Sequence, residues 1–349
     1  MPDGSPPDRT LRDADALIAA GLAPPEARPA LAAVAERYAV ALTPAMRALI
    51  ERPDDPIGRQ FIPDPAELRP AAGESADPIG DDALSPVKGI VHRYPDRVLL
   101  KPLLVCPVYC RFCFRREHVG ANGGLLSEAE LQAAYDWLAA RPAVREVILS
   151  GGDPLMLAPR RLAAIVQALS AIPHIEVLRV HSRVPVADPH RVTADLAVAL
   201  DSAKAMWLVV HANHAREFTA EAAAAIRRVQ THAIPVLGQS VLLRGVNDSV
   251  QALEDLYRAM IGLRVKPYYL HQLDAAPGTA RFRVSLAEGQ HLVAGLRGRV
   301  SGLAWPTYVL DIPGGHGKVP VNAGYLEPDA HIRDPWGGRH ELAGPVASV

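Results

Sequence analysis

The chain contains three cysteines, which lie close together as Cys106, Cys110 and Cys113 in the spacing Cys-x3-Cys-x2-Cys. Thiolates are the usual protein ligands of iron–sulfur clusters, so three of them on one loop can hold three irons of a cubane. The fourth iron then stays open to bind a small molecule. A structural zinc ion normally takes four protein ligands, and here His92 or His118 would have to complete the set. The spacing favours the cluster.

A second candidate segment, Ser150-Gly151-Gly152-Asp153, follows a short run of apolar and β-branched residues. Glycines at such a position let the backbone approach a ligand closely. The same residues would serve equally well in a plain turn between a strand and a helix. The segment becomes a candidate because it follows the next predicted strand after the cysteines.

A third candidate is Lys318, which ends the glycine-rich segment 313–318. A lysine on such a loop can present its amine to a carbonyl cofactor and form a Schiff base. The alternative is a lysine in a mobile surface turn. Taken alone, this segment favours the alternative, and only the other motifs of the chain change that balance.

Six short β-branched stretches, separated by helical stretches, are expected to position these residues. Strands that alternate with helices about every 30 residues indicate βαβ units and a parallel sheet. No dinucleotide-binding fingerprint follows the first strand, so we expect an α/β fold built as a partial (β/α)6 TIM-like barrel, with its site on the loops after the strands. The predicted strands are residues 98–105, 145–150, 175–180, 205–210, 234–240 and 264–270.

The remaining segments are less informative. Residues 10–21 and 30–51 are amphipathic and predict helices, and a turn-rich connection rich in Pro, Asp and Gly follows over residues 52–82. Two capping boxes, one from Ser127 and one from Ser285, predict helix starts. We expect three regions: an N-terminal helical and extended region over 1–90, the barrel over 91–300, and a C-terminal segment with Lys318 over 301–349.

The composition excludes several classes of protein. The chain has 349 residues, 37 Lys and Arg against 38 Asp and Glu, and a net charge of −1, so it lacks the basic footprint of a nucleic-acid-binding protein. It has no apolar run long enough to cross a membrane and no signal-peptide pattern. Three cysteines form no disulfide framework. We therefore expect a cytoplasmic protein that binds neither membranes nor nucleic acid.

The cysteine loop, with Phe112 before its last cysteine, resembles the signature of the radical S-adenosylmethionine (SAM) superfamily. This resemblance implies a [4Fe-4S] cluster whose open iron chelates the amino and carboxylate groups of SAM and whose electron releases a 5′-deoxyadenosyl radical. The segment from Ser150 to Asp153 resembles the superfamily motif that contacts the methionyl amino group.

From about residue 90 to 322 the chain resembles the lysine 2,3-aminomutase family, which are isomerases. The resemblance implies that Lys318 holds pyridoxal 5′-phosphate (PLP). It also implies that Arg93 and Arg97 lie around PLP, where a guanidinium can donate two parallel hydrogen bonds to phosphate. Gln239 would line the cofactor space. The segment 181–185 follows the family pattern too, although its role is left open.

The resemblance also implies how a substrate is held. Arg115 would grip the α-carboxylate, and Asp274 and Asp311 would hold the ε-ammonium of L-lysine. Two acids that face one ammonium relieve their repulsion only when a cation lies between them, which rejects anionic side chains. Asp311 could instead cap the turn before Pro313. Glutamate 2,3-aminomutases are not expected to keep both acids.

Three departures from the family pattern concern specificity and assembly. His271 stands where the family often has tyrosine, and His316 interrupts the glycines before Lys318. The cysteines that hold zinc between subunits in larger family members are missing, so a homodimer would have to form without zinc.

The expected function is that of an L-lysine 2,3-aminomutase, which interconverts L-lysine and β-lysine by radical 1,2-amino migration with the cluster, SAM and PLP. An electron donor such as flavodoxin or ferredoxin would be its partner. One alternative is the related enzyme that makes β-lysine for translation elongation factor P, and another is an aminomutase of a different amino acid such as glutamate. A radical SAM enzyme without PLP and a non-enzymatic iron- or zinc-binding module are the competing classes.

Overall fold

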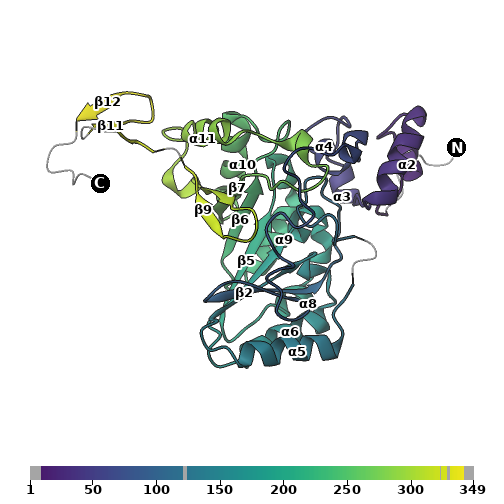
Figure 1. Cartoon of the computed structure of the whole chain (residues 1–349), viewed down its shortest axis with the longest axis vertical. Coiled ribbons are helices and arrows are strands. Elements are labelled where there is room, and N and C mark those ends of the chain that lie inside the picture. Colours follow the sequence, from purple (N-terminus) through teal and green to yellow (C-terminus); the bar gives the residue numbers. More distant parts are fainter. Residues whose placement is uncertain (1–8, 121–123, 323, 328–330, 342–349) are drawn as a thin grey trace.

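The computed structural model describes residues 9–120, 124–322, 324–327 and 331–341, and at its centre is one sheet of nine strands in sequential order (Figure 1). Strand β1 (Ile90–Tyr94) pairs antiparallel with β2 (Arg97–Leu103), and all pairs from β2 to β8 (Thr307–Asp311) are parallel. Strand β9 (Lys318–Pro320) returns antiparallel to β8. The strands between them are β3 (Glu146–Gly151), β4 (Val177–Ser182), β5 (Ala205–His211), β6 (Val236–Val241) and β7 (Val265–His271).

The six predicted strands are confirmed as β2 to β7, and β8 adds a seventh parallel strand. Figure 1 shows the sheet curving as the wall of a half-barrel, with α5, α6, α8 and α9 along its outer face. The sheet has β1 and β9 as its edges, so the barrel is open and the predicted partial TIM-like architecture is confirmed. The helices of this part are α5 (Glu128–Ala139), α6 (Pro159–Ser170), α7 (Val184–Ala187), α8 (Ala194–Val198), α9 (Ala220–Gln230), α10 (Val250–Gly262) and α11 (Leu286–Ala294).

Alternation along the strands separates a helix-covered face from a concave face. In β4, Leu178 and Val180 are fully buried in the main core, where they join Leu162 of α6. Arg179 and His181 alternate with them and line the cavity on the concave side. Because successive side chains of a strand point to opposite faces, every second side chain of β4 faces the cavity.

The N-terminal region contains short helices, and the predicted helix over residues 30–51 is only partly correct. The chain leaves the helix at Tyr38, where the backbone is extended, and Leu42 pairs with Leu11 in an antiparallel bridge. Thr43 then caps a new helix that begins at Pro44, a residue favoured in the first helical turn. The helices here are α1 (Ala14–Ala19), α2 (Arg28–Arg37), α3 (Pro44–Arg47) and α4 (Gly58–Phe61), and a 3-10 turn, η2, follows at Pro65–Leu68.

This N-terminal region packs against the cysteine loop. Leu17, Met46 and Phe61 are fully buried in a cluster that also contains Val108, which lies between the first two cysteines. A backbone hydrogen bond of 2.9 Å from the N–H of Tyr109 to the carbonyl of Ala41 joins the two segments. The region therefore forms a support for the loop that follows β2.

Beyond β9, a small antiparallel sheet of three strands extends away from the barrel (Figure 1). Its strands are β10 (Leu326–Glu327), β11 (His331–Arg333) and β12 (Arg339–Glu341). Among the described residues, no helix has both the length and the apolar character needed to cross a membrane.

Candidate active site

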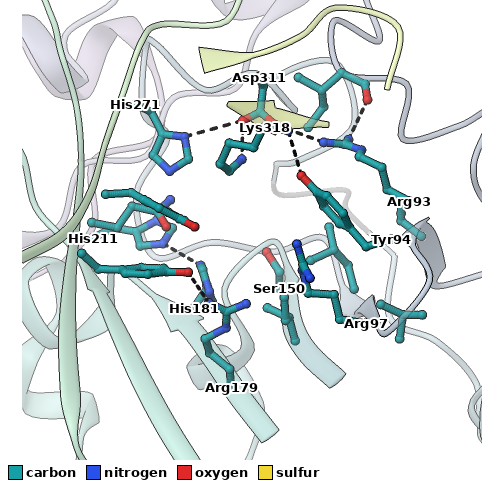
Figure 2. Close-up of a pocket in the computed structure, with 18 of the residues that line it drawn as sticks. Arg93, Tyr94, Arg97, Ser150, Arg179, His181, His211, His271, Asp311 and Lys318 are labelled. Carbon is teal, nitrogen blue, oxygen red and sulfur yellow. Dashed lines mark hydrogen bonds and ion pairs between the residues drawn. The ribbon is translucent and has the colours of Figure 1, made fainter. Parts of the chain in front are cut away.

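A cavity of about 630 Å³ opens on the concave face of the sheet, and this size is typical of small-molecule sites. Figure 2 shows that the labelled side chains converge on it from strands far apart in the sequence; Arg93 and Asp311, for example, are 218 positions apart. The predicted site residues that line the cavity are Arg93, Arg97, Arg115, Ser150, Gln239, Asp274, Asp311 and Lys318.

Lys318 lies directly opposite Asp311 in the pairing of β8 with β9. The turn between them has positive φ at Gly314, Gly315 and Gly317, a backbone conformation that favours glycine. This tight turn directs the Lys318 amine to the Asp311 carboxylate, with which it forms an ion pair. The lysine therefore belongs to the cavity wall and not to a solvent-exposed turn.

Asp311 is buried and binds several cationic or polar partners. Its carboxylate accepts from Arg93 Nη1 at 3.1 Å, pairs with Lys318, and lies 3.6 Å from Nδ1 of His271 (Figure 2). Burial alone would raise the pKa of Asp311, but the hydrogen bond with His271 and the charge of Lys318 lower it overall. The side chain thus faces the cavity network instead of capping the turn.

Asp274 contrasts with Asp311 because its carboxylate makes no hydrogen bond or ion pair with any described residue. Burial, with a smaller contribution from the negative charge of Asp311, raises the pKa of Asp274 to about 7. A carboxylate in this position is stabilised in its charged form when a cation enters beside it. The cavity therefore contains an unpartnered acid next to a partnered one.

The opposite end of the network is centred on Arg115. Its Nε donates to Asp81 at 2.7 Å, and its Nη1 lies 3.4 Å from the Ser150 hydroxyl. Arg93 and Lys101 also lie within 4.0 Å of the Asp81 carboxylate, at 3.4 and 3.9 Å. Burial disfavours the charged form of Asp81, but these cations, Arg115 first, lower its pKa.

Three histidines form part of the wall, and burial disfavours their charged forms. Nε2 of His211 lies 3.3 Å from Nδ1 of His181, and the rings meet edge to face (Figure 2). Burial lowers the pKa of all three rings. The pKa of His181 lies well below its ordinary value, that of His211 is about 3, and that of His271 is also lowered. Positive charge in the cavity therefore comes from arginine and lysine.

Several lining residues were not singled out from the sequence. Arg179, His211, Tyr268 and Tyr269 line the cavity, and their only sequence signal is the alternation within β4, β5 and β7. The two adjacent tyrosines share this wall because the β6–β7 pairing has an irregularity that leaves Tyr268 as an extra residue. Such an irregularity is invisible in the sequence.

Cys106, Cys110 and Cys113 lie on the loop after β2 and are half-buried. Burial raises the pKa of all three thiols, that of Cys113 to about 11, so iron would have to stabilise their thiolates. Within the described residues, no three His, Cys, Asp or Glu side chains are gathered around one position as a single metal ion requires. His92, one proposed fourth zinc ligand, packs against Trp137 instead.

Two buried charged groups hold this loop. Glu67 of η2 accepts from Arg111 at 3.0 Å and also pairs with Arg116, and all three side chains are fully buried. On the other side, Nη1 of Arg183 lies 3.1 Å from the Cys110 sulfur, while its Nη2 pairs with Glu217 at 2.7 Å. A buried ion pair is rarely a net gain in stability but fixes geometry.

The segment after β3 is packed against the same loop. A Cβ on Gly151 would lie 2.7 Å from the Leu103 carbonyl oxygen, and one on Gly152 would lie 2.4 Å from that of Val105, so both positions require glycine. Asp153 is buried and accepts from the Ser182 hydroxyl at 2.7 Å and from the N–H of Arg183 at 2.6 Å. It joins the ends of β3 and β4, and it does not line the cavity.

The donor sets fit the cofactors that the motifs imply. Phe112 is buried edge to face against Phe282 and stiffens a loop that offers three thiols for a cluster. For PLP, the cavity offers the Lys318 amine and, on the β2 and β4 walls, the guanidinium groups of Arg97 and Arg179. Arg97 lies over the Tyr94 ring, 3.8 Å from its centroid, and is partly exposed.

Comparisons with known proteins agree with this arrangement. Residues 100–257 match the profile of the Radical SAM superfamily, and residues 293–332 match that of Lysine-2,3-aminomutase. The L-lysine 2,3-aminomutase of Acetoanaerobium sticklandii is 41% identical over 294 residues, which cover 84% of this chain and 71% of that protein. That of Fusobacterium nucleatum is 41% identical over 83% of this chain and 69% of its own length. The glutamate 2,3-aminomutase of Clostridioides difficile is 34% identical, over 84% and 70%.

Proposed function

Because the chain belongs to the lysine 2,3-aminomutase family of radical SAM enzymes, we propose that it interconverts L-lysine and β-lysine by radical 1,2-amino migration. The family implies a [4Fe-4S] cluster, SAM and PLP. When bound, the cluster and SAM supply the radical that removes a hydrogen atom from the substrate, and PLP supplies the carbonyl to which the migrating amino group is attached.

The observation that carries the choice of substrate is the pair Asp274 and Asp311 on the wall that also bears Lys318. Lys318 would hold PLP through its amine, which would leave Asp311 with one cationic partner fewer and with room for an ammonium group between the two acids. Arg115, whose Nη2 has no partner among the described residues, lies in the same cavity and is the proposed partner of the α-carboxylate.

The relative that acts on glutamate makes this amino acid the second candidate. An anionic side chain between Asp274 and Asp311 would add a third negative charge to a buried site, which is strongly unfavourable. The carboxylate pair thus supports lysine over glutamate. The enzyme that serves translation elongation factor P has the same chemistry and would differ in the fate of its β-lysine.

The test is anaerobic reconstitution with iron, sulfide and PLP, followed by dithionite, SAM and isotopically labelled L-lysine or L-glutamate. We expect labelled β-lysine by mass spectrometry, with no net loss of SAM and no product from glutamate. Deoxyadenosine formed with unchanged lysine would keep the radical chemistry and contradict the substrate. The proposal also includes an electron donor such as flavodoxin or ferredoxin, and a homodimer, which light scattering tests.

A further inference from the structure

We propose that Asp81, from the turn-rich segment before β1, is a positioning residue that fixes the Arg115 guanidinium for the α-carboxylate of the substrate. This inference rests on the proposed function. Asp81 is only 5% exposed, and its carboxylate binds Arg115 Nε at 2.7 Å. The contact engages the inner nitrogen of the guanidinium. Of the outer two, Nη1 makes only the 3.4 Å contact with Ser150 and Nη2 has no partner among the described residues, which leaves this edge open to a bidentate carboxylate.

Arg115 needs such a restraint because it borders two cavities. Besides the main cavity, a second one of about 280 Å³ is lined by Asp81, Lys101, Phe114 and Arg115. Among the described residues, Phe114 and Arg115 are the two that line both cavities. A long side chain with space on either side adopts several rotamers and loses entropy when a ligand fixes it. The Asp81 contact on the side of the second cavity holds Nε there, and Nη1 lies 3.4 Å from the Ser150 hydroxyl in the main one.

The backbone around Asp81 is itself fixed. Its N–H donates to Asp77 at 2.7 Å, and its carbonyl accepts from the Ser85 hydroxyl at 2.7 Å. Gly80 has φ +71°, and a Cβ there would lie 3.0 Å from the backbone of Gly314, in the turn that carries Lys318. The carboxylate therefore has a defined position relative to both ends of the cavity.

Asp81 also connects the two ends electrostatically. Arg93 lies 3.4 Å from Asp81 and 3.1 Å from Asp311, so Arg115, Asp81, Arg93, Asp311 and Lys318 form a chain of alternating charge. Lys101, 3.9 Å from Asp81, is a third cation beside this carboxylate. Three cations thus share the one charge of Asp81, so Arg115 keeps part of its attraction for an anion.

The test compares the binding of L-lysine and L-lysinamide, which differ only in the α-carboxylate, to the reconstituted holoenzyme without reductant, by calorimetry. We expect the wild type to prefer L-lysine by about tenfold or more. We expect Asp81→Asn, like Arg115→Met, to bring the ratio of the two affinities close to one. The double variant of Asp81→Asn and Arg115→Met should have the same ratio as Arg115→Met alone. Asp82→Asn is the matched control, because the Asp82 side chain is largely exposed and its carboxylate pairs with His118, at 3.8 Å, and not with Arg115.

A folded Asp81→Asn protein that keeps the full preference for L-lysine would overturn the inference and leave the proposed function intact. A wild type without preference would overturn it as well, while β-lysine formation tests the function independently. If Asp81→Asn alone folds poorly, Lys101→Met is added, because it removes one cation that the Asp81 carboxylate would no longer compensate. The ratio of the affinities for L-lysine and L-lysinamide is then measured in this double variant.

Discussion

The two ends of the cavity hold opposite charges in different ways. At the Arg115 end, one buried carboxylate, Asp81, is shared by three cations. At the other end, Asp311 binds cations of the protein whereas Asp274 has no partner among the described residues. A charge that is already compensated orients its neighbours, and a charge that is not compensated is available to a ligand. The proposed substrate, with a carboxylate at one end and an ammonium at the other, would match this contrast.

Removal of the lysine breaks this arrangement most completely. Lys318→Ala should abolish β-lysine formation and prevent borohydride from attaching pyridoxal to the protein, because the amine opposite Asp311 is lost. Its iron content should stay at the wild-type level, since the cysteine loop lies elsewhere. Peptide mass spectrometry after reduction measures the attachment, and a labelled peptide without residue 318 would contradict the assignment.

Removal of either acid should disable the ammonium end alone. Asp274→Asn or Asp311→Asn should weaken L-lysine binding by about 3 kcal/mol, because each takes a charged partner from a desolvated ammonium. The preference for L-lysine over L-lysinamide should persist, since Arg115 is unchanged. Calorimetry with both ligands tests whether the two ends bind independently. If the variants lose the preference for L-lysine over L-lysinamide together with the affinity for L-lysine, the two ends do not bind independently.

The unpartnered acid should lower stability when no ligand is present. The pKa of Asp274 is raised from 3.8 to about 7, so the unfolded state ionises first and stability falls as pH rises from 4 through 7. Asp274→Asn should therefore increase the free energy of unfolding at pH 8 by about 2–4 kcal/mol, and by almost nothing at pH 4. Urea unfolding at both pH values checks this, and Asp82→Asn provides an exposed control.

The same raised pKa gives binding a pH dependence. Below pH 7 the Asp274 carboxyl of the free protein is mostly protonated and cannot pair with an ammonium, so L-lysine affinity should fall by roughly a factor of ten per pH unit. In Asp274→Asn, affinity should be weak and nearly flat between pH 6 and 8. If the L-lysine affinity of the wild type is equally independent of pH, the pKa of Asp274 is not raised above that of Asp311 as described.

Much of the barrel was predictable because its signals are local. Six apolar stretches became β2 to β7, and motif residues such as Lys318, Asp311 and Arg115 line one cavity because strand ends meet on one side of a sheet. The capping box at Ser127 is present as predicted. These patterns need only the residues within a few positions of each other.

The contacts that hold the site were not predictable in this way. Asp81 and Glu67 lie in segments that read only as turns, and their partners Arg115 and Arg111 are 34 and 44 positions away. An ion pair between distant segments leaves no period in the sequence. The helix predicted over 30–51 is interrupted for a related reason, because the bridge of Leu42 with Leu11 is a contact between distant segments.

The buried pairing of Glu67 with Arg111 and Arg116 has a consequence for repair after oxygen damage. These bonds join the protein to itself and involve no iron, so we expect the cysteine loop to keep its shape when an oxidised cluster is lost. We then expect reloading with iron and sulfide to require no refolding of the N-terminal region.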